Sequence, residues 1–288
     1  MDIVVLGARG MLGRDLVDVL EERPRTHRVT GWDIDEIDIT DRRAVAARLR
    51  ETGADIVINC AAYTAVDKAE VERDKAFRVN ALGARHVAAC ARDIGARSVV
   101  ISTDYVFDGT KEDPYREDDR SSPVNYYGHT KLMAEWFTLD ADPDSLIVRT
   151  EWLYGAHGKN FVDTMVKLSG ELEKISVVDD QRGSPTYARD LALAIAILVE
   201  ARCRGIYHVS NRGQTTWCAY ARTIFRMVDR DIQVLPISSD EYRAPARRPK
   251  NSVFELGKLI GDTGHAPRPW EEALRDYLST RKEKAAPD

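Results

Sequence analysis

Short runs of apolar, mostly β-branched residues alternate with longer segments of helical apolar periodicity through the first two-thirds of the chain. A buried strand followed by a helix is the repeating unit of a parallel sheet. The alternation therefore predicts an α/β fold with a doubly wound parallel sheet. The predicted strands are residues 2–6, 27–32, 37–41, 55–59, 99–101, 145–149 and 205–210, and the predicted helices are residues 10–22, 42–51, 75–94, 160–168, 188–200 and one that starts near 127.

The alternation weakens beyond residue 150. Residues 150–155 are aromatic and loop-like, and residues 177–186 form a polar connection that contains Gly183 and Pro185. A helix over 217–228, a strand over 233–236 and a helix over 269–280 follow. We therefore expect one domain from residues 1–149 and 186–212, a smaller C-terminal lobe from residues 150–185 and 213–281, and a flexible tail at 282–288.

Composition and charge restrict the function classes. The 288 residues are enough for one large domain or two smaller ones. The 42 Lys and Arg residues are scattered among 47 Asp and Glu residues, with a net charge of −5, which argues against nucleic acid as a partner. No run of about 18 apolar residues occurs, and the chain starts directly with a strand. We expect a cytoplasmic protein with no membrane partner.

The cysteines and histidines indicate no metal site. The six histidines are dispersed, and none lies in an HExxH-type pattern. The cysteines form no CxxC pair and are expected to be buried thiols in a reducing compartment, namely Cys60, Cys90, Cys203 and Cys218.

A glycine motif with the spacing GxxGxxG follows the first strand. Gly7, Gly10 and Gly13 permit a tight turn and close backbone approach, and the helix that opens there offers free N–H groups to a pyrophosphate. Asp33 follows Gly13 by twenty residues, at the end of the second strand, where it can bind an adenosine ribose. A structural turn is the alternative, but the strand, the helix and Asp33 together favour a dinucleotide cofactor.

Residues suited to proton transfer follow the strand at 99–101. Ser102, Thr103 and Asp104 stand at its carboxyl end, where open α/β sheets bind ligands. Tyr127 and Lys131 lie four residues apart at the start of a helix and so share one face. In the reduction of a ketone, Tyr127 can donate the proton, Lys131 can lower the pKa of the phenol, and Thr103 can hydrogen-bond the carbonyl oxygen. YxxxK alone also occurs on ordinary surface helices, so this interpretation depends on the glycine motif.

Eight segments in order along the chain carry a resemblance to a known family. The chain resembles the dTDP-4-dehydrorhamnose reductases of the extended short-chain dehydrogenase/reductase superfamily, which have a Rossmann-type cofactor domain and a substrate-binding lobe. The resemblance covers residue 3 to about residue 280. The segments are GARGMLG, INCAAYTAVDKAE, VISTDYVFDG, NYYGHTKLMAE, VRTEWLYG, NFVDTM, DDQRGSPTY and RRPKNS.

The resemblance implies roles for individual residues. Tyr127 would be the proton donor, Lys131 its partner and a ribose ligand, and Thr103 the group that binds the carbonyl oxygen. Asp104 and Trp152 would lie beside the sugar, although Trp152 is also a candidate for packing between the lobes. Besides Gly13 and Asp33, the residues implied along the cofactor are Gly7, Arg9, Gly10, Met11, Leu12, Asp38, Ile39, Ala61, Ala62, Tyr63, Tyr127 and Lys131.

The reaction implied by the resemblance is reduction of the 4-keto group of dTDP-4-dehydro-β-L-rhamnose to dTDP-β-L-rhamnose. A dehydratase of this superfamily carries Asp-Glu after the Thr, whereas here Asp104 and Tyr105 follow Thr103. Another nucleotide-sugar reductase, an epimerase and a non-catalytic regulatory subunit stay open as alternatives. Some family members bind Mg²⁺ at a dimer interface, but the sequence shows no acidic cluster that could take this ion. A homodimer is expected.

The choice of cofactor depends on two residues. Asp33 would repel a 2′-phosphate, which favours NADH. Arg9 could attract that phosphate. Because residues 34–36 contain two acids and no cation, we expect NADH to serve at least as well as NADPH, with dual use.

Overall fold

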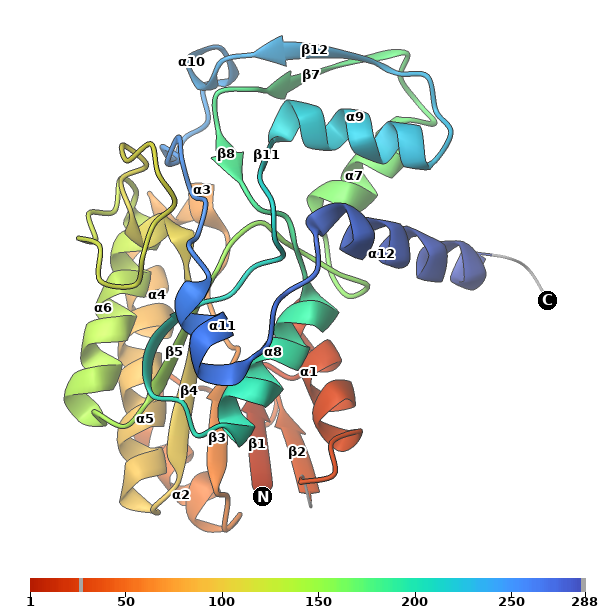
Figure 1. The fold of residues 1–288 in the computed structure, drawn as a ribbon. Helices are drawn as coiled ribbons and strands as arrows, with labels where there is room; N and C mark the ends of the chain where they lie inside the picture. Colours follow the sequence, from red (N-terminus) through yellow and green to blue (C-terminus); the bar gives the residue numbers. More distant parts are fainter. Residues whose placement is uncertain (26–27, 286–288) are drawn as a thin grey trace.

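The computed structural model describes residues 1–25 and 28–285 and is built around a six-stranded sheet (Figure 1). All its pairings are parallel, in the order β10-β5-β4-β3-β1-β2, which confirms the predicted α/β fold of the Rossmann type. Its strands are β1 (Asp2–Leu6), β2 (Arg28–Trp32), β3 (Ile56–Asn59), β4 (Arg97–Thr103), β5 (Leu146–Thr150) and β10 (Gly205–His208). The larger helices around it are α1 (Met11–Glu21), α2 (Arg42–Arg50), α5 (Ala84–Asp93), α6 (Tyr126–Ala141) and α8 (Ala188–Glu200).

Alternate residues of the strands face opposite helical layers. Ile3 and Val5 belong to one core cluster with apolar side chains of α1 and α8. Val4 and Leu6 belong to another with α2 and α5, while α6 packs beside α5 and β4. Because helices cover both faces of the sheet, its central strands are continuous runs of apolar residues. These runs made the strands predictable from the sequence.

The predicted helix over residues 75–94 is interrupted by a π-helical turn. Three segments follow one another without a break: α4 (Arg73–Phe77), η1 (Arg78–Gly83) and α5. Single π-helical turns inside α-helices occur often at functional sites. This one carries Asn80, which contributes to the site described below.

A second lobe lies beyond the carboxyl ends of the strands (Figure 1). Its core consists of aromatic and aliphatic side chains from three helices and a two-stranded parallel sheet. It also contains two pairs of two-residue strands. Its elements are β6 (Leu153–Tyr154), α7 (Phe161–Leu168), β7 (Lys174–Val178), β8 (Arg182–Gly183), β9 (Thr186–Tyr187), β11 (Thr215–Thr216), α9 (Trp217–Met227), β12 (Gln233–Ile237) and α12 (Trp270–Ala285). The remaining short elements are α3 (Val66–Ala69), η2 (Asp104–Val106), α10 (Ser239–Tyr242) and α11 (Gly257–Thr263).

Three predictions of local structure are wrong. Residues 37–41 form turns and not a strand, because Asp38 and Asp41 accept hydrogen bonds from nearby backbone N–H groups while the loop buries Ile37 and Ile39. Residues 177–178 belong to strand β7, inside the predicted polar connection. The last helix ends at Ala285 and not at 280. The predicted strand start at His27 and residues 286–288 lie outside the described residues.

Candidate active site

The glycine motif joins β1 to α1 in a geometry that suits a diphosphate. Gly7 has a φ of +73°, and a Cβ there would lie 2.7 Å from the backbone nitrogen of Ala61. Only glycine fits this close approach. Gly10 is the N-cap of α1 and provides no side-chain cap, so the N–H groups of the first turn, which contains Met11 and Leu12, can bind an anion. These residues fit the diphosphate of a dinucleotide.

Asp33 and Arg9 meet at the end of β2. The backbone N–H of Arg9 donates to Asp33 Oδ2 at 2.9 Å. The Arg9 guanidinium donates to the carboxylates of Asp35 and Glu36, each at 2.9 Å. All three side chains are well exposed, so these ion pairs contribute little free energy and leave Arg9 able to move. In this structure the two acids hold Arg9 beside Asp33.

The loop after β3 lies next to Gly7 and is fixed by Asn80. Asn80 is 1% exposed; its Oδ1 accepts from the N–H of Tyr63 at 2.7 Å, and its Nδ2 donates to the Tyr63 carbonyl at 3.1 Å. Nδ2 also donates to Thr130 Oγ1 in α6 at 2.9 Å. Asn80 therefore ties the segment Ala61, Ala62 and Tyr63 to the helix that carries Tyr127. We assigned Asn80 no role from the sequence, because only tertiary contacts reveal it.

Two of the expected cofactor residues lie in the loop that follows β2. Asp38 is exposed, and its Oδ1 accepts from the N–H of Thr40 at 2.8 Å. Ile39 is 4% exposed and packs in the core beside Gly83. The Ile39 side chain therefore serves the core, and a ligand would meet chiefly the backbone of this loop.

Thr103 is the last residue of β4, and Asp104 is the first residue of η2. The Thr103 hydroxyl donates to Asp104 Oδ1 at 2.8 Å and accepts from the N–H of Tyr105 at 3.3 Å. The Ser252 hydroxyl donates to Asp104 Oδ2 at 2.5 Å. Burial raises the pKa of Asp104 to about 6, and the two hydroxyl donors oppose this rise. Ser252 comes from the RRPKNS segment, which was quoted for the resemblance but given no role.

The start of α6 brings Tyr127 to the end of β4. Asn125 caps the helix: its side chain accepts from the N–H of Gly128 at 2.7 Å and donates to the Arg247 carbonyl at 2.7 Å. A Cβ at Gly128 would overlap the carbonyl oxygen of Tyr105. Glycine therefore lets the first turn pack closely on η2, with the rings of Tyr105 and Tyr127 edge-to-face at 5.8 Å.

The surroundings of Tyr127 and Lys131 shift both their pKa values. Burial raises the pKa of Tyr127, the charge of Asp104 raises it further, and the Thr103 hydroxyl opposes the rise. Burial lowers the pKa of Lys131 to about 8, while the charge of Glu135 opposes that change. Lys131 Nζ donates to the Ile101 carbonyl at 2.6 Å. The Thr103 hydroxyl is therefore the group beside Tyr127 that partly offsets the rise in the phenol pKa.

A buried ion pair between α6 and β5 stabilises the arrangement of Tyr127 and Lys131. Glu135 in α6 and Arg149 in β5 are 1% and 2% exposed and form two hydrogen bonds, of 2.8 and 2.7 Å. Ser102 in β4 donates to Glu135 at 2.5 Å. Arg149 also lies beside His208 of β10, whose pKa is lowered well below its usual value by burial and by the charge of Arg149. The network joins α6 to three strands of the sheet.

Trp152 stacks on a tryptophan of the second lobe. Its ring and that of Trp217 are parallel within 8°, with centroids 3.6 Å apart. Trp152 has a φ of +43°, a conformation that costs a non-glycine residue free energy, and Gly183 leaves the space that its ring occupies. The stack forms a wall next to the end of β5.

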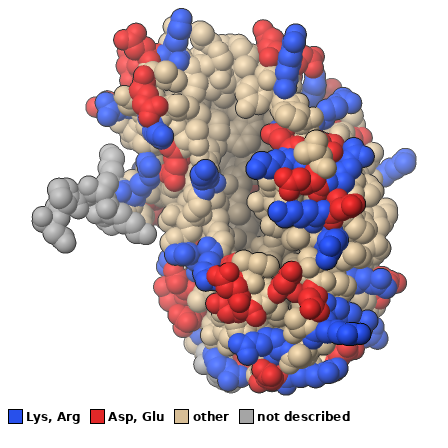
Figure 2. All heavy atoms as spheres, turned by 180° about the vertical axis from the view of Figure 1, so that it is seen from behind, with Lys and Arg blue, Asp and Glu red and all other residues tan. Residues whose placement is uncertain are grey.

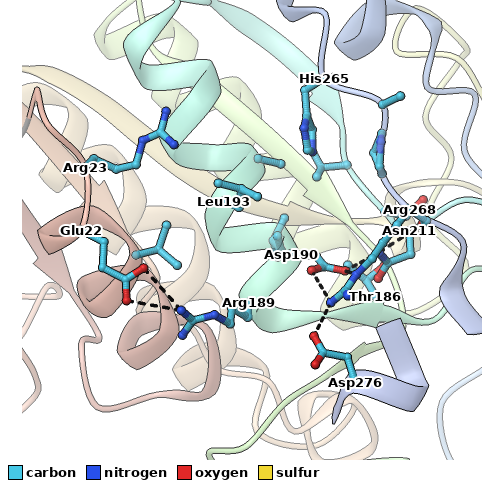
Figure 3. A pocket seen from close by; sticks show the side chains of 17 residues that line it. Glu22, Arg23, Thr186, Arg189, Asp190, Leu193, Asn211, His265, Arg268 and Asp276 are labelled. Atoms are coloured by element: carbon cyan, nitrogen blue, oxygen red, sulfur yellow. Dashed lines mark hydrogen bonds and ion pairs between the residues drawn. The ribbon is translucent and has the colours of Figure 1, made fainter. Parts of the chain in front are cut away.

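A different cleft, of about 530 Å³, lies between α1, α8 and the segment before α12 (Figure 3). None of the predicted site residues lines it. Most of its charged side chains pair within the cleft: Arg189 with Glu22 at 3.3 Å, and Arg268 with Asp190 and Asp276 at 2.8 Å each. Arg23 instead pairs with Glu200 at 2.6 Å. The predicted residues therefore gather elsewhere, at the carboxyl ends of the strands.

The described residues show neither a cluster for a metal nor a membrane span. Over residues 1–25 and 28–285, no three His, Cys, Asp or Glu side chains are placed together to hold a metal ion. Within the same residues no helix is both long and apolar enough to cross a membrane.

The face opposite to that of Figure 1 is hollowed along an uncharged groove, and the rims of this groove carry both acidic and basic side chains (Figure 2).

Comparison with known proteins identifies the family. The family model described as the RmlD substrate binding domain matches residues 1–283. The chain belongs to the RmlD family. A curated RmlD relative, the spore coat polysaccharide biosynthesis protein SpsK of Bacillus subtilis, is 41% identical over 97% of both chains. The dTDP-4-dehydrorhamnose reductase of Streptomyces griseus is 42% identical over 95% of this chain and 91% of its own.

Solved structures agree with this RmlD membership. The dTDP-4-dehydrorhamnose reductase of Bacillus anthracis, solved in complex with NADP, has a TM-score of 0.93 and 42% identity over 97% of this chain and 99% of its own. A UDP-glucose 4-epimerase of Thermus thermophilus has a TM-score of 0.82 but is 18% identical, and so shares the fold alone. The predicted family is confirmed.

Proposed function

We propose that this RmlD chain is an NAD(P)H-dependent oxidoreductase that reduces the 4-keto group of dTDP-4-dehydro-β-L-rhamnose to give dTDP-β-L-rhamnose. The observation that carries this proposal is the convergence of Thr103, Tyr127 and Lys131 at the carboxyl end of β4. Relatives at 41–43% identity are named dTDP-4-dehydrorhamnose reductases, which supports the choice of substrate.

NADH or NADPH, when bound, supplies the hydride that adds to C4 of the sugar. The glycine motif with Arg9, Met11, Leu12 and the loops of residues 33–39 and 61–63 would hold the cofactor. As the carbonyl becomes an alkoxide, the Tyr127 O–H bond breaks and its proton moves to that oxygen. The Thr103 hydroxyl would hydrogen-bond the same oxygen, turning from Asp104. Because the pKa of Tyr127 is raised, the phenol stays protonated at neutral pH, as this role requires.

Lys131 and the second lobe complete the proposed site. The ammonium of Lys131 would bind the cofactor ribose and stabilise the phenolate formed after proton transfer. The lobe of residues 150–185 and 213–281 would bind the sugar nucleotide, with Asp104 and Trp152 beside the sugar. A cytoplasmic location and a homodimer stay predictions.

The function is tested by supplying dTDP-4-dehydro-6-deoxyglucose, a 3,5-epimerase and reduced cofactor, with NMR identification of the product. We expect dTDP-β-L-rhamnose. A second candidate is reduction of the unepimerised sugar, since a 44% identical relative from Streptomyces niveus is named dTDP-4-keto-6-deoxy-D-glucose reductase. Omitting the epimerase distinguishes the two: turnover at an equal rate would favour the second candidate. An epimerase would instead retain its cofactor, and a regulatory subunit would give no product.

We expect Trp152→Ala to raise the KM for the sugar nucleotide more than about tenfold, and to lower the free energy of unfolding by about 1–2 kcal/mol through loss of the stack on Trp217. Trp217→Ala is the matched comparison, because it removes the same stack from the other side. Urea unfolding and steady-state kinetics give both quantities. If both variants lost stability but neither changed KM, Trp152 would be a packing residue only.

For the cofactor, we expect kcat/KM with NADH to be at least as high as with NADPH. Asp33→Ala should shift the ratio toward NADPH by removing the charge that repels a 2′-phosphate. Asp18→Ala, at an exposed position of α1, removes an equal charge elsewhere and should leave the ratio unchanged. A parent enzyme with more than about tenfold preference for NADPH would show that Arg9 outweighs Asp33.

A further inference from the structure

Glu151 is a buried carboxyl group that the proposed reaction does not use. It follows the last residue of β5 and is 2% exposed. Its Oε2 accepts from the backbone N–H of Ser184 at 2.8 Å, whereas Oε1 is buried and has no hydrogen-bond partner among the described residues. Buried polar atoms in native proteins are nearly always satisfied. An orphaned oxygen at the end of a central strand therefore points to a partner that arrives with a ligand.

Glu151 lies between the two residues proposed to contact the sugar. The pairing of β4 with β5 sets Thr103 against Thr150, so Asp104 and Glu151 leave the sheet side by side at the same edge. Trp152 is the next residue along the chain. A Cβ at Gly183 would lie 2.4 Å or more from the Trp152 ring and 2.7 Å from Glu151 Oε2, so these two side chains pack on the same turn of the second lobe.

Asp104 and Glu151 are both buried, and neither forms an ion pair within the described residues. Two such carboxyl groups that act on each other cannot both stay ionised. Asp104 accepts from one hydroxyl at each of its two oxygens, which stabilises its carboxylate, whereas Glu151 accepts from the Ser184 N–H at Oε2 and has no partner at Oε1 among the described residues. The proton therefore belongs on Glu151.

The pKa of Glu151 agrees with this assignment. Burial raises it well above its usual value, and the charge of Asp104 raises it further. The other groups that act on it are neutral, the backbone of Phe254 and the backbone and hydroxyl of Ser184, and they oppose the rise. No cation among the principal influences reverses the shift.

We propose that Glu151, in its acid form, is a specificity-determining residue that donates a hydrogen bond from its orphaned oxygen to the sugar of the nucleotide-sugar substrate. With the Asp104 carboxylate beside it, the pair offers one donor and one acceptor, the combination that recognises a hydroxyl group. This inference rests on the proposed function, because it takes the sugar to lie between Asp104 and Trp152.

The test compares Glu151→Gln with Glu151→Met in the full-length protein. Gln keeps an N–H donor and the acceptor for Ser184 and stays neutral at every pH, whereas Met fills a similar volume without either. We expect Glu151→Gln to keep the sugar KM within about threefold of the parent, and Glu151→Met to raise it more than about tenfold, with the cofactor KM unchanged in both. Thermal unfolding checks that both variants fold.

The pH dependence gives a second readout, with the sign set by the acid form. The measured quantity is the sugar KM of the parent divided by the sugar KM of Glu151→Gln. Below the raised pKa of Glu151 this ratio stays constant. As the pH rises through that pKa, the ratio increases because the parent loses its hydrogen-bond donor and its KM rises. A ratio that falls as pH rises would mean that the carboxylate binds the sugar, and would overturn the proposal.

Asp142→Asn is the matched control. Asp142 is another buried carboxyl group, and it accepts a hydrogen bond from Ser145 Oγ at 3.1 Å. It lies before the amino end of β5, away from the proposed sugar site. It should leave the sugar KM unchanged. A tenfold higher KM in Glu151→Gln, or an unchanged KM in Glu151→Met, would refute the role of Glu151 while the parent still reduces the sugar. A parent that reduces no dTDP-linked 4-keto sugar would instead refute the proposed function.

Discussion

Tyr127→Phe is expected to lower kcat by a factor on the order of 10² to 10⁴ while the KM for the cofactor changes little. The substitution removes one hydroxyl, which acts chiefly when the alkoxide forms and not when the ligands bind. The ring and its edge-to-face contact with Tyr105 are kept, so α6 should start as before. Steady-state kinetics with saturating cofactor and sugar nucleotide measure the loss.

Tyr126→Phe is the control for this experiment. Tyr126 occupies the preceding position in the same helical turn, but its ring stacks on His129 and lies under the guanidinium of Arg73. Losing that hydroxyl should leave kcat within about twofold, as expected for a group outside the reaction. A Tyr127→Phe enzyme with nearly normal kcat would remove Tyr127 from the mechanism.

Arg149→Met should lower the free energy of unfolding by about 3–5 kcal/mol, because it leaves the Glu135 carboxylate buried without its cation. Combining it with Glu135→Leu removes both charges and should recover most of that loss. Urea unfolding of the two single variants and the double variant gives the coupling between the two side chains.

An exposed ion pair provides the comparison. Arg204 and Asp144 are 59% and 61% exposed, so Arg204→Met should cost no more than about 1 kcal/mol. If Arg149→Met were equally mild, the buried pair would not hold α6 against the sheet. The position of Lys131, one turn before Glu135 on α6, would then need another explanation.

The sequence located the residues whose spacing is local. The glycine motif and the pair Tyr127 and Lys131 follow from helical and strand periodicity within a few residues, and they were found in this way. The alternation of apolar and polar residues predicted a strand at residues 37–41, which was wrong because Ile37 and Ile39 are buried side chains of a loop. Strand β7 was missed, since it belongs to a two-stranded sheet and alternates apolar residues with exposed Lys174 and Ser176.

Long-range contacts could not be predicted from these patterns. Asn80 contacts Thr130 from 50 residues away and Ser252 contacts Asp104 from 148 residues away, and the partner of Glu135 is Arg149 of another element, so no local period predicts these contacts. The protonation chemistry was also out of reach: spacing placed Lys131 near Tyr127, but only the packed structure shows that burial and Asp104 raise the phenol pKa.

The segment that includes Arg247, Arg248 and Ser252 contacts the site at the cap of α6 and at Asp104, and also contacts Asp67 of α3. The Arg247 carbonyl accepts from the Asn125 side chain that caps α6, the Arg248 guanidinium donates to Asp67 at 2.7 and 2.9 Å, and Ser252 donates to Asp104. A ribosome makes the glycine motif, β4 and Tyr127 long before it makes this segment. When a nascent chain has left the ribosome only as far as β12, its cofactor-binding half can already fold. At that stage Asn125, which caps α6, and the Asp104 carboxylate still lack the partners that this segment provides. The hydrogen bonds of the α6 cap and of Asp104 are therefore complete only once residues 247–252 have been made.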